Sequence, residues 1–161
     1  MANANLGLEK GAFEAPGILR ADGLYFLVVS GKTGWRSNPN KVFWATSLSG
    51  PWEGGTDVAP AAENTYNSQN TFELTIKGSH ATAYIYMGDA WDSDGSAASN
   101  YVWLPMSVNS RLVNAPLFRQ EVWLISCMSR SAKSITLEYY PKWKVDVKTG
   151  IVSIPNDQTP S

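Results

Sequence analysis

Leu24–Trp35 reads LYFLVVSGKTGW, an apolar run of strand length followed by a polar loop that ends in tryptophan. The run Leu24–Ser30 is almost continuously hydrophobic, which is typical of a β-strand buried on both faces. Just before it, Ala21-Asp22-Gly23 predicts a hairpin turn, because Asp-Gly tolerates positive φ at both central positions. The stretch therefore predicts a buried hairpin strand that delivers a loop carrying an aromatic ring.

The same theme recurs further along the chain, at YIYMGDAW (84–91) and at EYYPKW (138–143) with VDVKTG (145–150) downstream. These blocks indicate equivalent hairpins that present their loops to one end, as propeller blades do. The sequence predicts roughly nine or ten short strands and no helix with caps and periodicity. The clearest strands are 18–20, 24–30, 41–46, 71–76, 81–87, 101–106, 134–138, 143–147 and 151–154, with 53–66 irregular. At about four strands per blade, this all-β pattern fits two to three blades of a β-propeller.

Charge and composition exclude several kinds of partner. The chain has 161 residues and a net charge of −1, with Cys127 and His80 as its single cysteine and histidine. Nucleic acids and anionic membranes need a concentrated basic face, so we expect neither as a partner. No stretch reaches the ~20 apolar residues of a membrane helix, and Met1–Leu8 lacks the features of a signal peptide. His80 lies in a predicted turn, and we expect neither a metal nor a cofactor.

Aromatic side chains are unusually frequent. The chain has seven tryptophans and seven tyrosines, and many of them lie beside Gly, Asn, Asp or Ser. Flat rings next to hydrogen-bonding groups suit sugars, which have an apolar ring face and a polar rim. Aromatic side chains also fill β-sheet cores, and composition alone favours neither interpretation.

Three polar residues are candidates for chemistry on a sugar. Glu14, in Phe13-Glu14-Ala15-Pro16, is a candidate general acid, since glycoside hydrolysis needs a group that protonates the leaving oxygen. Asp89 follows a glycine at a strand end with Trp91 two residues on, so it could bond sugar hydroxyls beside a stacking ring. Gln69 enters a strand from a polar loop, and its amide both donates and accepts. The competing interpretations are an exposed Glu at a strand entrance and an Asx turn at Asp89.

Several segments in register resemble glycoside hydrolase family 43, and within it the exo-β-1,3-galactanase-like group (galactan 1,3-β-galactosidases). The segments are Glu14–Pro16, Tyr25 with Ser30–Trp35, Ser49–Trp52, Ser68–Thr71, Tyr86–Trp91, Tyr101–Pro105, Leu137–Trp143 and Thr149-Gly150. Each motif alone is weak, but six or more in order are fairly specific. The match runs from about Phe13 to Val152.

The resemblance implies a five-bladed β-propeller and an exo-acting, inverting hydrolase of β-1,3-galactan or related galactose-containing glycans. It implies that Glu14 is the general acid and that Gln69, which could take a proton only as its imidic tautomer, is the base. It also places Thr33, Trp35, Asp89 and Trp91 in loops that line the sugar site. We therefore expect a partial five-bladed propeller of roughly three blades, with a secreted location implied by the family.

The chain departs from the family in two ways. Family domains are roughly twice as long, so we expect residues 1–12 to be a lead-in, 13–154 the C-terminal part of a propeller, and 155–161 a disordered tail. Residues 111–130 fit no part of the pattern, and an extra hairpin or a mistranslated gene segment would both explain them. Exposed blade faces predict self-association. A non-catalytic galactan-binding module, an inactive fragment and a β-protein without a sugar site remain alternatives.

Overall fold

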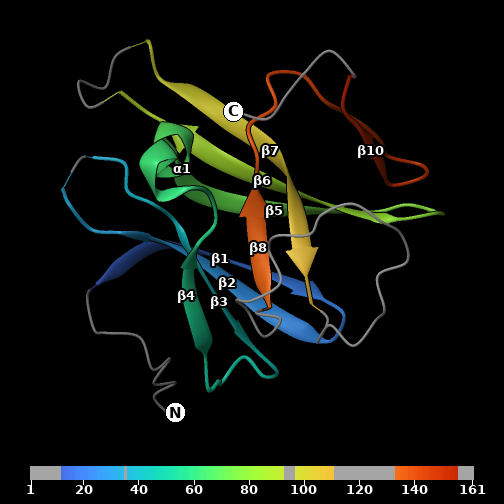
Figure 1. Cartoon of the computed structure of the whole chain (residues 1–161), viewed down its shortest axis with the longest axis horizontal. Helices are drawn as coiled ribbons and strands as arrows, with labels where there is room; N and C mark the ends of the chain where they lie inside the picture. Colours follow the sequence, from blue (N-terminus) through green and yellow to red (C-terminus); the bar gives the residue numbers. More distant parts are fainter. Residues whose placement is uncertain (1–11, 35, 93–96, 111–132, 156–161) are drawn as a thin grey trace, which may run out of the picture.

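The computed structural model describes residues 12–34, 36–92, 97–110 and 133–155, and these residues form antiparallel sheets (Figure 1). The first sheet has the order β1 (Phe13–Ala21), β2 (Leu24–Gly31), β3 (Lys41–Ala45) and β4 (Glu53–Asp57). The second has the order β5 (Gln69–Lys77), β6 (Thr82–Ala90), β7 (Asn100–Asn109) and β8 (Ser134–Leu137). A hairpin of β9 (Lys144–Asp146) and β10 (Ile151–Ser153) follows.

Each four-stranded sheet is a meander in which consecutive strands pair, and this is the arrangement of a propeller blade. The all-β class and the partial propeller are therefore confirmed, with two complete blades and a two-stranded third one. The atypical segment 111–130 and nearly all of the lead-in and tail lie outside the described residues.

One part of the secondary structure differs from the expectation. The segment 53–66, expected to be irregular, contains β4 and, next to it, the short helices η1 (Ala61–Glu63) and α1 (Asn64–Asn67). Strand β4 was missed because Gly54 and Gly55 have low strand propensity and adopt φ of 107° and 93°. No helix in the described part of the chain is long and apolar enough to cross a membrane.

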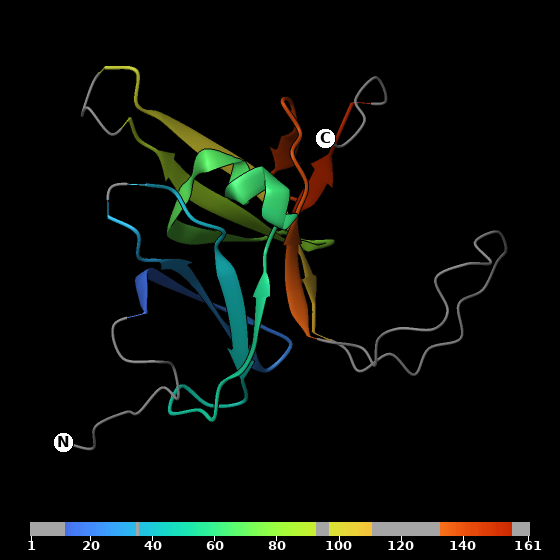
Figure 2. The same cartoon turned by 60° about the vertical axis from the view of Figure 1, so that its left-hand side comes forward.

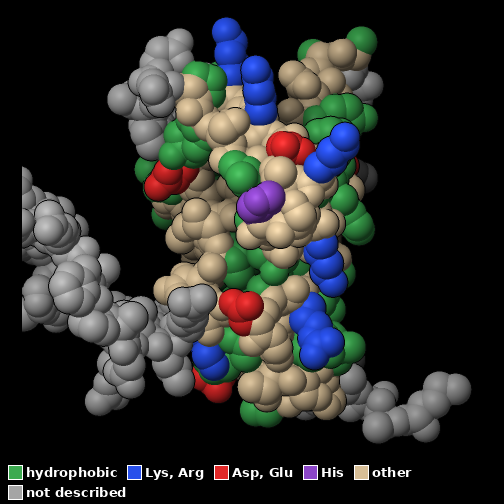
Figure 3. All heavy atoms as spheres, turned by 90° about the vertical axis from the view of Figure 1, so that its right-hand side faces the viewer, with side chains coloured by type: hydrophobic (Ala, Val, Ile, Leu, Met, Phe, Trp, Pro, Cys, Tyr) green, Lys and Arg blue, Asp and Glu red, His purple; other side chains and the backbone are tan. Residues whose placement is uncertain are grey.

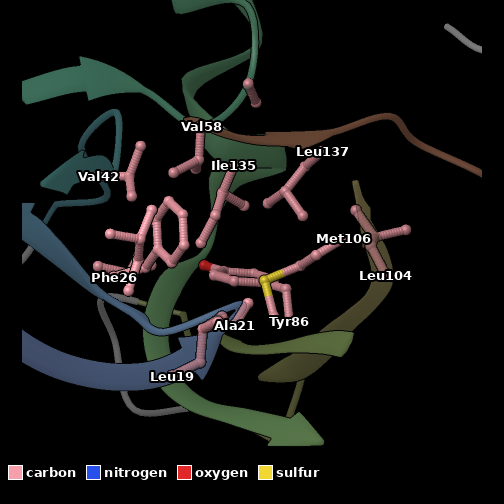
Figure 4. Packing of buried hydrophobic residues seen from close by; sticks show 13 residues of the cluster. Leu19, Ala21, Phe26, Val42, Val58, Tyr86, Leu104, Met106, Ile135 and Leu137 are labelled. Carbon is pink, nitrogen blue, oxygen red and sulfur yellow. The ribbon is translucent and has the colours of Figure 1, made fainter. Parts of the chain in front are cut away.

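The core lies between the two blades (Figure 4). Phe26 of β2 points toward Tyr86 of β6, and Ile135 and Leu137 of β8 close the cluster. Strand β2 is buried along most of its length, as the apolar run Leu24–Ser30 predicts. Burial of each large apolar side chain contributes about 1.5–3 kcal/mol, so packing of one blade on the other is the main source of stability.

The loops with aromatic side chains emerge on one side. Figure 2 shows the segment after β2 and the segment between β6 and β7 projecting from the same side, next to the start of β1. The third block packs against the second blade, because Trp143 Nε1 donates to the Trp103 carbonyl at 2.9 Å. The first two blocks thus deliver their loops together, as the repeated pattern predicts.

Candidate active site

The two residues expected to act as acid and base are in direct contact. Glu14 lies at the start of β1, the first strand of blade one, and Gln69 begins β5, the first strand of blade two. These two strands pack against each other. Gln69 Nε2 donates a hydrogen bond to Glu14 Oε1 at 2.9 Å. The chain therefore folds back to bring together a carboxyl and an amide that are 55 positions apart in the sequence.

Both side chains lie beside a β-bulge. On β1, Glu14 pairs with Ser30 and Gly17 with Val28, so β1 has one extra residue there. On β5, the register shifts in the same way between Asn70 and Phe72. A bulge turns the neighbouring side chain out of the regular alternation, and it commonly does so next to active sites.

The backbone next to both residues adopts left-handed conformations. Ala15 has φ of 52°, and all four residues of α1, Asn64–Asn67, have φ between 47° and 56°. Left-handed backbone costs a non-glycine residue roughly 1–2 kcal/mol, so the run before Gln69 stores strain. Strained backbone of this kind gathers at functional sites, where surrounding contacts hold it in place.

A buried hydrogen-bond network supplies those contacts. Asn40 is fully buried; its backbone N–H donates to Thr65 Oγ1 at 2.8 Å, and its Nδ2 donates to the Ser68 carbonyl at 3.0 Å. Asn40 Oδ1 accepts from the Asn70 N–H at 3.2 Å. The Tyr86 hydroxyl accepts from Asn40 Nδ2 at 3.3 Å and bonds Ser68 Oγ at 3.0 Å. Ser68 and Asn70 flank Gln69 in sequence, so the network fixes the backbone on both sides of Gln69.

A cavity of about 580 Å³ opens over this pair. Its lining includes Glu14 and Gln69 with Ala15, Gly34 and Trp91. The volume lies within the range of roughly 300–1,000 Å³ that is usual for small-molecule sites. A carboxyl, an amide and an indole therefore meet in one cavity, which combines proton transfer, hydrogen bonding and an apolar surface.

The other expected site residues are placed less centrally. Asp89 is the cross-strand partner of Gln69, so the two side chains share a face of the second blade. Thr33 is exposed beside Gly34 of the cavity, and its hydroxyl donates to Asn38 Oδ1 at 3.0 Å. Trp35 lies outside the described residues.

The sequence reasoning missed a buried carboxyl. Glu73 of β5 is only 6% exposed, and burial raises the pKa of its carboxyl to about 7. It lies against the backbone of β1: a Cβ added to Gly17 would be 2.0 Å from Glu73 Oε2. Within β5, Phe72 and Leu74 on either side of Glu73 are exposed. A charged residue between two hydrophobic ones resembles an ordinary alternating strand, and the sequence alone does not show which face is buried.

The raised pKa of the Glu73 carboxyl predicts that the stability of the protein depends on pH. Its folded pKa, about 7, lies above the usual value of 4.5, so its contribution is full below pH 4.5 and is lost as pH rises through 7. We expect the free energy of unfolding of the wild type to fall by about 3 kcal/mol relative to Glu73→Gln across this window. Urea unfolding at both ends of the window measures the difference. The exposed control Glu53→Gln should show the same change in the free energy of unfolding with pH as the wild type. If Glu73→Gln also shows the wild-type change with pH, the prediction is contradicted.

The comparisons with known proteins concern the fold and the sequence of the whole chain. No protein-family model matches the chain, and no curated protein sequence does. Among solved structures, the chain is similar to the exo-β-1,3-galactanase of Phanerochaete chrysosporium in complex with galactose, with 35% identity and a TM-score of 0.69 over 92% of this chain. It is also similar to an exo-β-1,3-galactanase from Clostridium thermocellum, with 31% identity and a TM-score of 0.68 over 91%. A family 43 β-1,3-galactosidase matches at 39% identity over 59% of this chain and 20% of its own, with a TM-score of 0.54.

These solved enzymes are much longer than the matched segment. The chain spans 29% of the Phanerochaete enzyme and 28% of the Clostridium enzyme. The matched segment covers more than nine-tenths of this chain in both comparisons. The resemblance to the exo-β-1,3-galactanase-like group of glycoside hydrolase family 43 is therefore confirmed, and this chain corresponds to a little over a quarter of those enzymes.

Proposed function

We propose that this chain carries the acid and base of an exo-acting, inverting hydrolase of β-1,3-galactan. The observation that supports this most is the hydrogen bond between Gln69 Nε2 and Glu14 Oε1 inside a cavity that Trp91 also lines. The similarity to exo-β-1,3-galactanases, one of which was solved with galactose, supports the substrate class.

In the proposed reaction, Glu14 gives its proton to the glycosidic oxygen as the bond to the anomeric carbon breaks. A water molecule attacks that carbon from the opposite face of the ring, which inverts its configuration. The proton of this water passes to the nitrogen of Gln69 in its imidic tautomer, while the tautomer's hydroxyl proton passes to solvent, which leaves Gln69 as the amide. The amide has to return to the imidic tautomer before the next turnover. Glu14 ends as the carboxylate and takes up a proton from solvent before the next turnover.

The hydrogen bond between Glu14 and Gln69 sets a condition on this reaction. In inverting enzymes the acid and the base are roughly 6.5–9.5 Å apart, because the sugar and a water lie between them. Glu14 and Gln69 touch at 2.9 Å, so the contact describes the site without substrate. A galactosyl group that enters the cavity has to separate the two side chains, and its own hydroxyls then take over the hydrogen bonds.

We assign substrate binding to the loops around this pair. Trp91 lines the cavity and offers an indole face for the apolar side of galactose. Asp89 and Thr33 supply a carboxylate and a hydroxyl on neighbouring segments, and Trp35 belongs to the same loop as Thr33. These four residues are proposed to hold the terminal galactosyl group of a galactan chain.

Binding and galactose release, measured on the wild type and on Trp91→Ala, separate hydrolysis from simple binding and test the role of Trp91. We expect the wild type to bind β-1,3-galactotriose and release galactose, and we expect Trp91→Ala to bind about 10-fold more weakly, a loss of roughly 1.4 kcal/mol. Titration calorimetry measures binding, and chromatography measures the galactose. Binding without release would favour a non-catalytic galactan-binding module, and the closed Glu14–Gln69 contact is the observation that favours that alternative. Absence of binding would contradict both functions.

We also propose that the outer face of the second blade joins two copies of the chain. Phe72, Tyr101 and Trp103 are 55%, 69% and 50% exposed, and Met87 lies between Phe72 and Trp103 in the strand register. On the side of the molecule that Figure 3 shows, the right-hand side of Figure 1, hydrophobic side chains are interrupted by Lys, Arg, Asp and Glu, so the apolar face is defined by the strand register and not by that view. A contiguous exposed apolar face of this kind is typical of an interaction surface.

This association is testable by sedimentation. We expect the wild type to dimerise with rising concentration and Phe72→Ser/Trp103→Ser to remain monomeric, because the double variant removes the two largest central side chains of the face. Leu48→Ser, at an exposed turn between β3 and β4, is the matched control and should behave as the wild type. A wild type that stays monomeric at every concentration contradicts the proposal.

A further inference from the structure

The proposed reaction does not use the carboxyl of Glu73, which is buried beside β1. Its oxygens occupy the space beside Gly17, where an added Cβ would lie 2.0 Å from Oε2 and 2.4 Å from Oε1. The absence of a side chain at Gly17 is therefore what gives the carboxyl room. Gly17 is three residues from Glu14 on β1, and Glu73 is four residues from Gln69 on β5.

Asn70 connects this carboxyl to the backbone next to Glu14. The Asn70 side chain interacts with the Glu73 carboxyl in a way that lowers its pKa, against the larger effect of burial. Asn70 Nδ2 donates a hydrogen bond to the Ala15 carbonyl at 3.2 Å. Ala15 is the left-handed residue of the β1 bulge, with φ of 52°. The path from Glu73 through Asn70 to Ala15 thus ends at the peptide that orients Glu14.

Two acceptors on this path lack a donor. Glu73 Oε1 and Asn70 Oδ1 are both buried and have no hydrogen-bond partner among the described residues. An ionised carboxylate only accepts hydrogen bonds, so it leaves both atoms unsatisfied. A protonated carboxyl has one O–H donor, and the oxygen of the neighbouring amide is an acceptor for it. Each unsatisfied buried group is costly, so the neutral form suits this position.

The surroundings of Glu73 also favour the neutral form. Titratable side chains on the strands packed around it are Glu14 and Arg20 on β1, Tyr25 on β2, and Tyr84, Tyr86 and Asp89 on β6, with Lys77 on its own strand. The ion pair found in the described part of the chain joins Lys41 to Asp57, and Glu73 has no such partner there. Burial is the main cause of its raised pKa, and it outweighs the hydrogen bonds with Asn70 and with the Glu73 backbone, which lower this pKa. Burial is also the main cause of the raised pKa of Tyr86, and the charge of Glu73 is a smaller one.

We propose that Glu73 in its protonated form is a positioning residue, which holds the Ala15 peptide through Asn70 and so sets the contact between Glu14 and Gln69. The inference rests on the proposed function, because that function makes the contact between Glu14 and Gln69 important for catalysis. The effect on the contact itself is measurable without any hydrolysis. Galactose release is measured in parallel. An inactive wild type would contradict the proposed function, whereas the positioning role is tested by the contact alone.

The test is the NMR signal of the Gln69 side-chain amide in the full chain labelled with ¹⁵N. This amide donates to Glu14, so its chemical shift reports the contact. Spectra are recorded from about pH 5.5 to 8.5, and the signal is assigned by its loss in Gln69→Leu. We expect the wild-type signal to move with a midpoint near 7, and the Glu53→Gln control to behave in the same way.

Three variants test the role of the Glu73 carboxyl. Glu73→Gln keeps an uncharged donor and acceptor, so its Gln69 signal should stay at the low-pH wild-type position throughout. Glu73→Leu should hold the signal at a displaced position at every pH. Gly17→Ala should displace it as well, because the added methyl group takes the place of the carboxyl.

Two results would overturn the proposal. One is a Gln69 signal at the wild-type position in both Glu73→Leu and Gly17→Ala. The other is a wild-type titration that persists in Glu73→Gln, since another group then causes it. If Glu73→Leu and Gly17→Ala fail to fold, Glu73→Gln still decides the matter, because glutamine has nearly the same volume and shape as glutamate.

Discussion

Glu14→Gln is expected to lower the rate of galactose release from β-1,3-galactotriose by about 10²–10⁴-fold, the usual contribution of a general acid. Glutamine has the same size and can still hydrogen-bond Gln69, but it has no proton to give to the leaving oxygen. We therefore expect kcat to fall while KM stays near the wild-type value, because the cavity lined by Gln69 and Trp91 is unchanged.

The control for this experiment is Glu53→Gln, the same chemical change at an exposed position of β4. It should release galactose at the wild-type rate. Equal rates in Glu14→Gln and the wild type would remove Glu14 from the role of general acid. A large rise in KM at constant kcat would instead assign Glu14 to substrate binding.

Asn40→Ala is expected to destabilise the protein by about 3–5 kcal/mol, because it leaves the Ser68 carbonyl and the Asn70 N–H buried without partners, at roughly 1–3 kcal/mol each, and removes the bond to Tyr86. Total stability of a domain is usually about 5–15 kcal/mol, so this loss is severe. Denaturant unfolding measures it directly.

The matched control for Asn40→Ala is Asn100→Ala, an exposed asparagine at the start of β7 whose side chain bonds the next backbone N–H. Its effect should stay within about 0.5 kcal/mol, as is usual for surface substitutions. Similar losses in the two variants would show that the network around Gln69 contributes little to stability. They would also remove the physical basis for a fixed Gln69 backbone.

Local sequence was sufficient to predict most of the fold. Strand β2 is a continuous apolar run bounded by an Asp-Gly turn, so both its existence and its burial follow from the residues themselves. Strand β4 has the opposite character: EGGTD contains two glycines and no β-branched hydrophobic residue. It forms because β3 offers an edge to pair with, which is a tertiary effect that no local pattern shows.

The residues of the candidate site were likewise predictable from the sequence only in part. Glu14 and Gln69 were predicted because family motifs surround them, and the structure brings them into contact. Asn40 and Glu73 were missed because each acts through residues distant in sequence, Asn40 through Ser68 and Glu73 through the space at Gly17. A sequence shows that a residue is polar, and only the packed blades show that it is buried and what it bonds.

The most direct test of the account is a proton NMR time course of β-1,3-galactotriose with the wild-type chain. Inversion at a β-linked terminal galactose produces α-galactose, so this anomer should appear first, before mutarotation mixes the two. Glu14→Gln should release neither anomer on the same timescale. A trisaccharide that stays intact with the wild type, or β-galactose as the first product, would contradict the account.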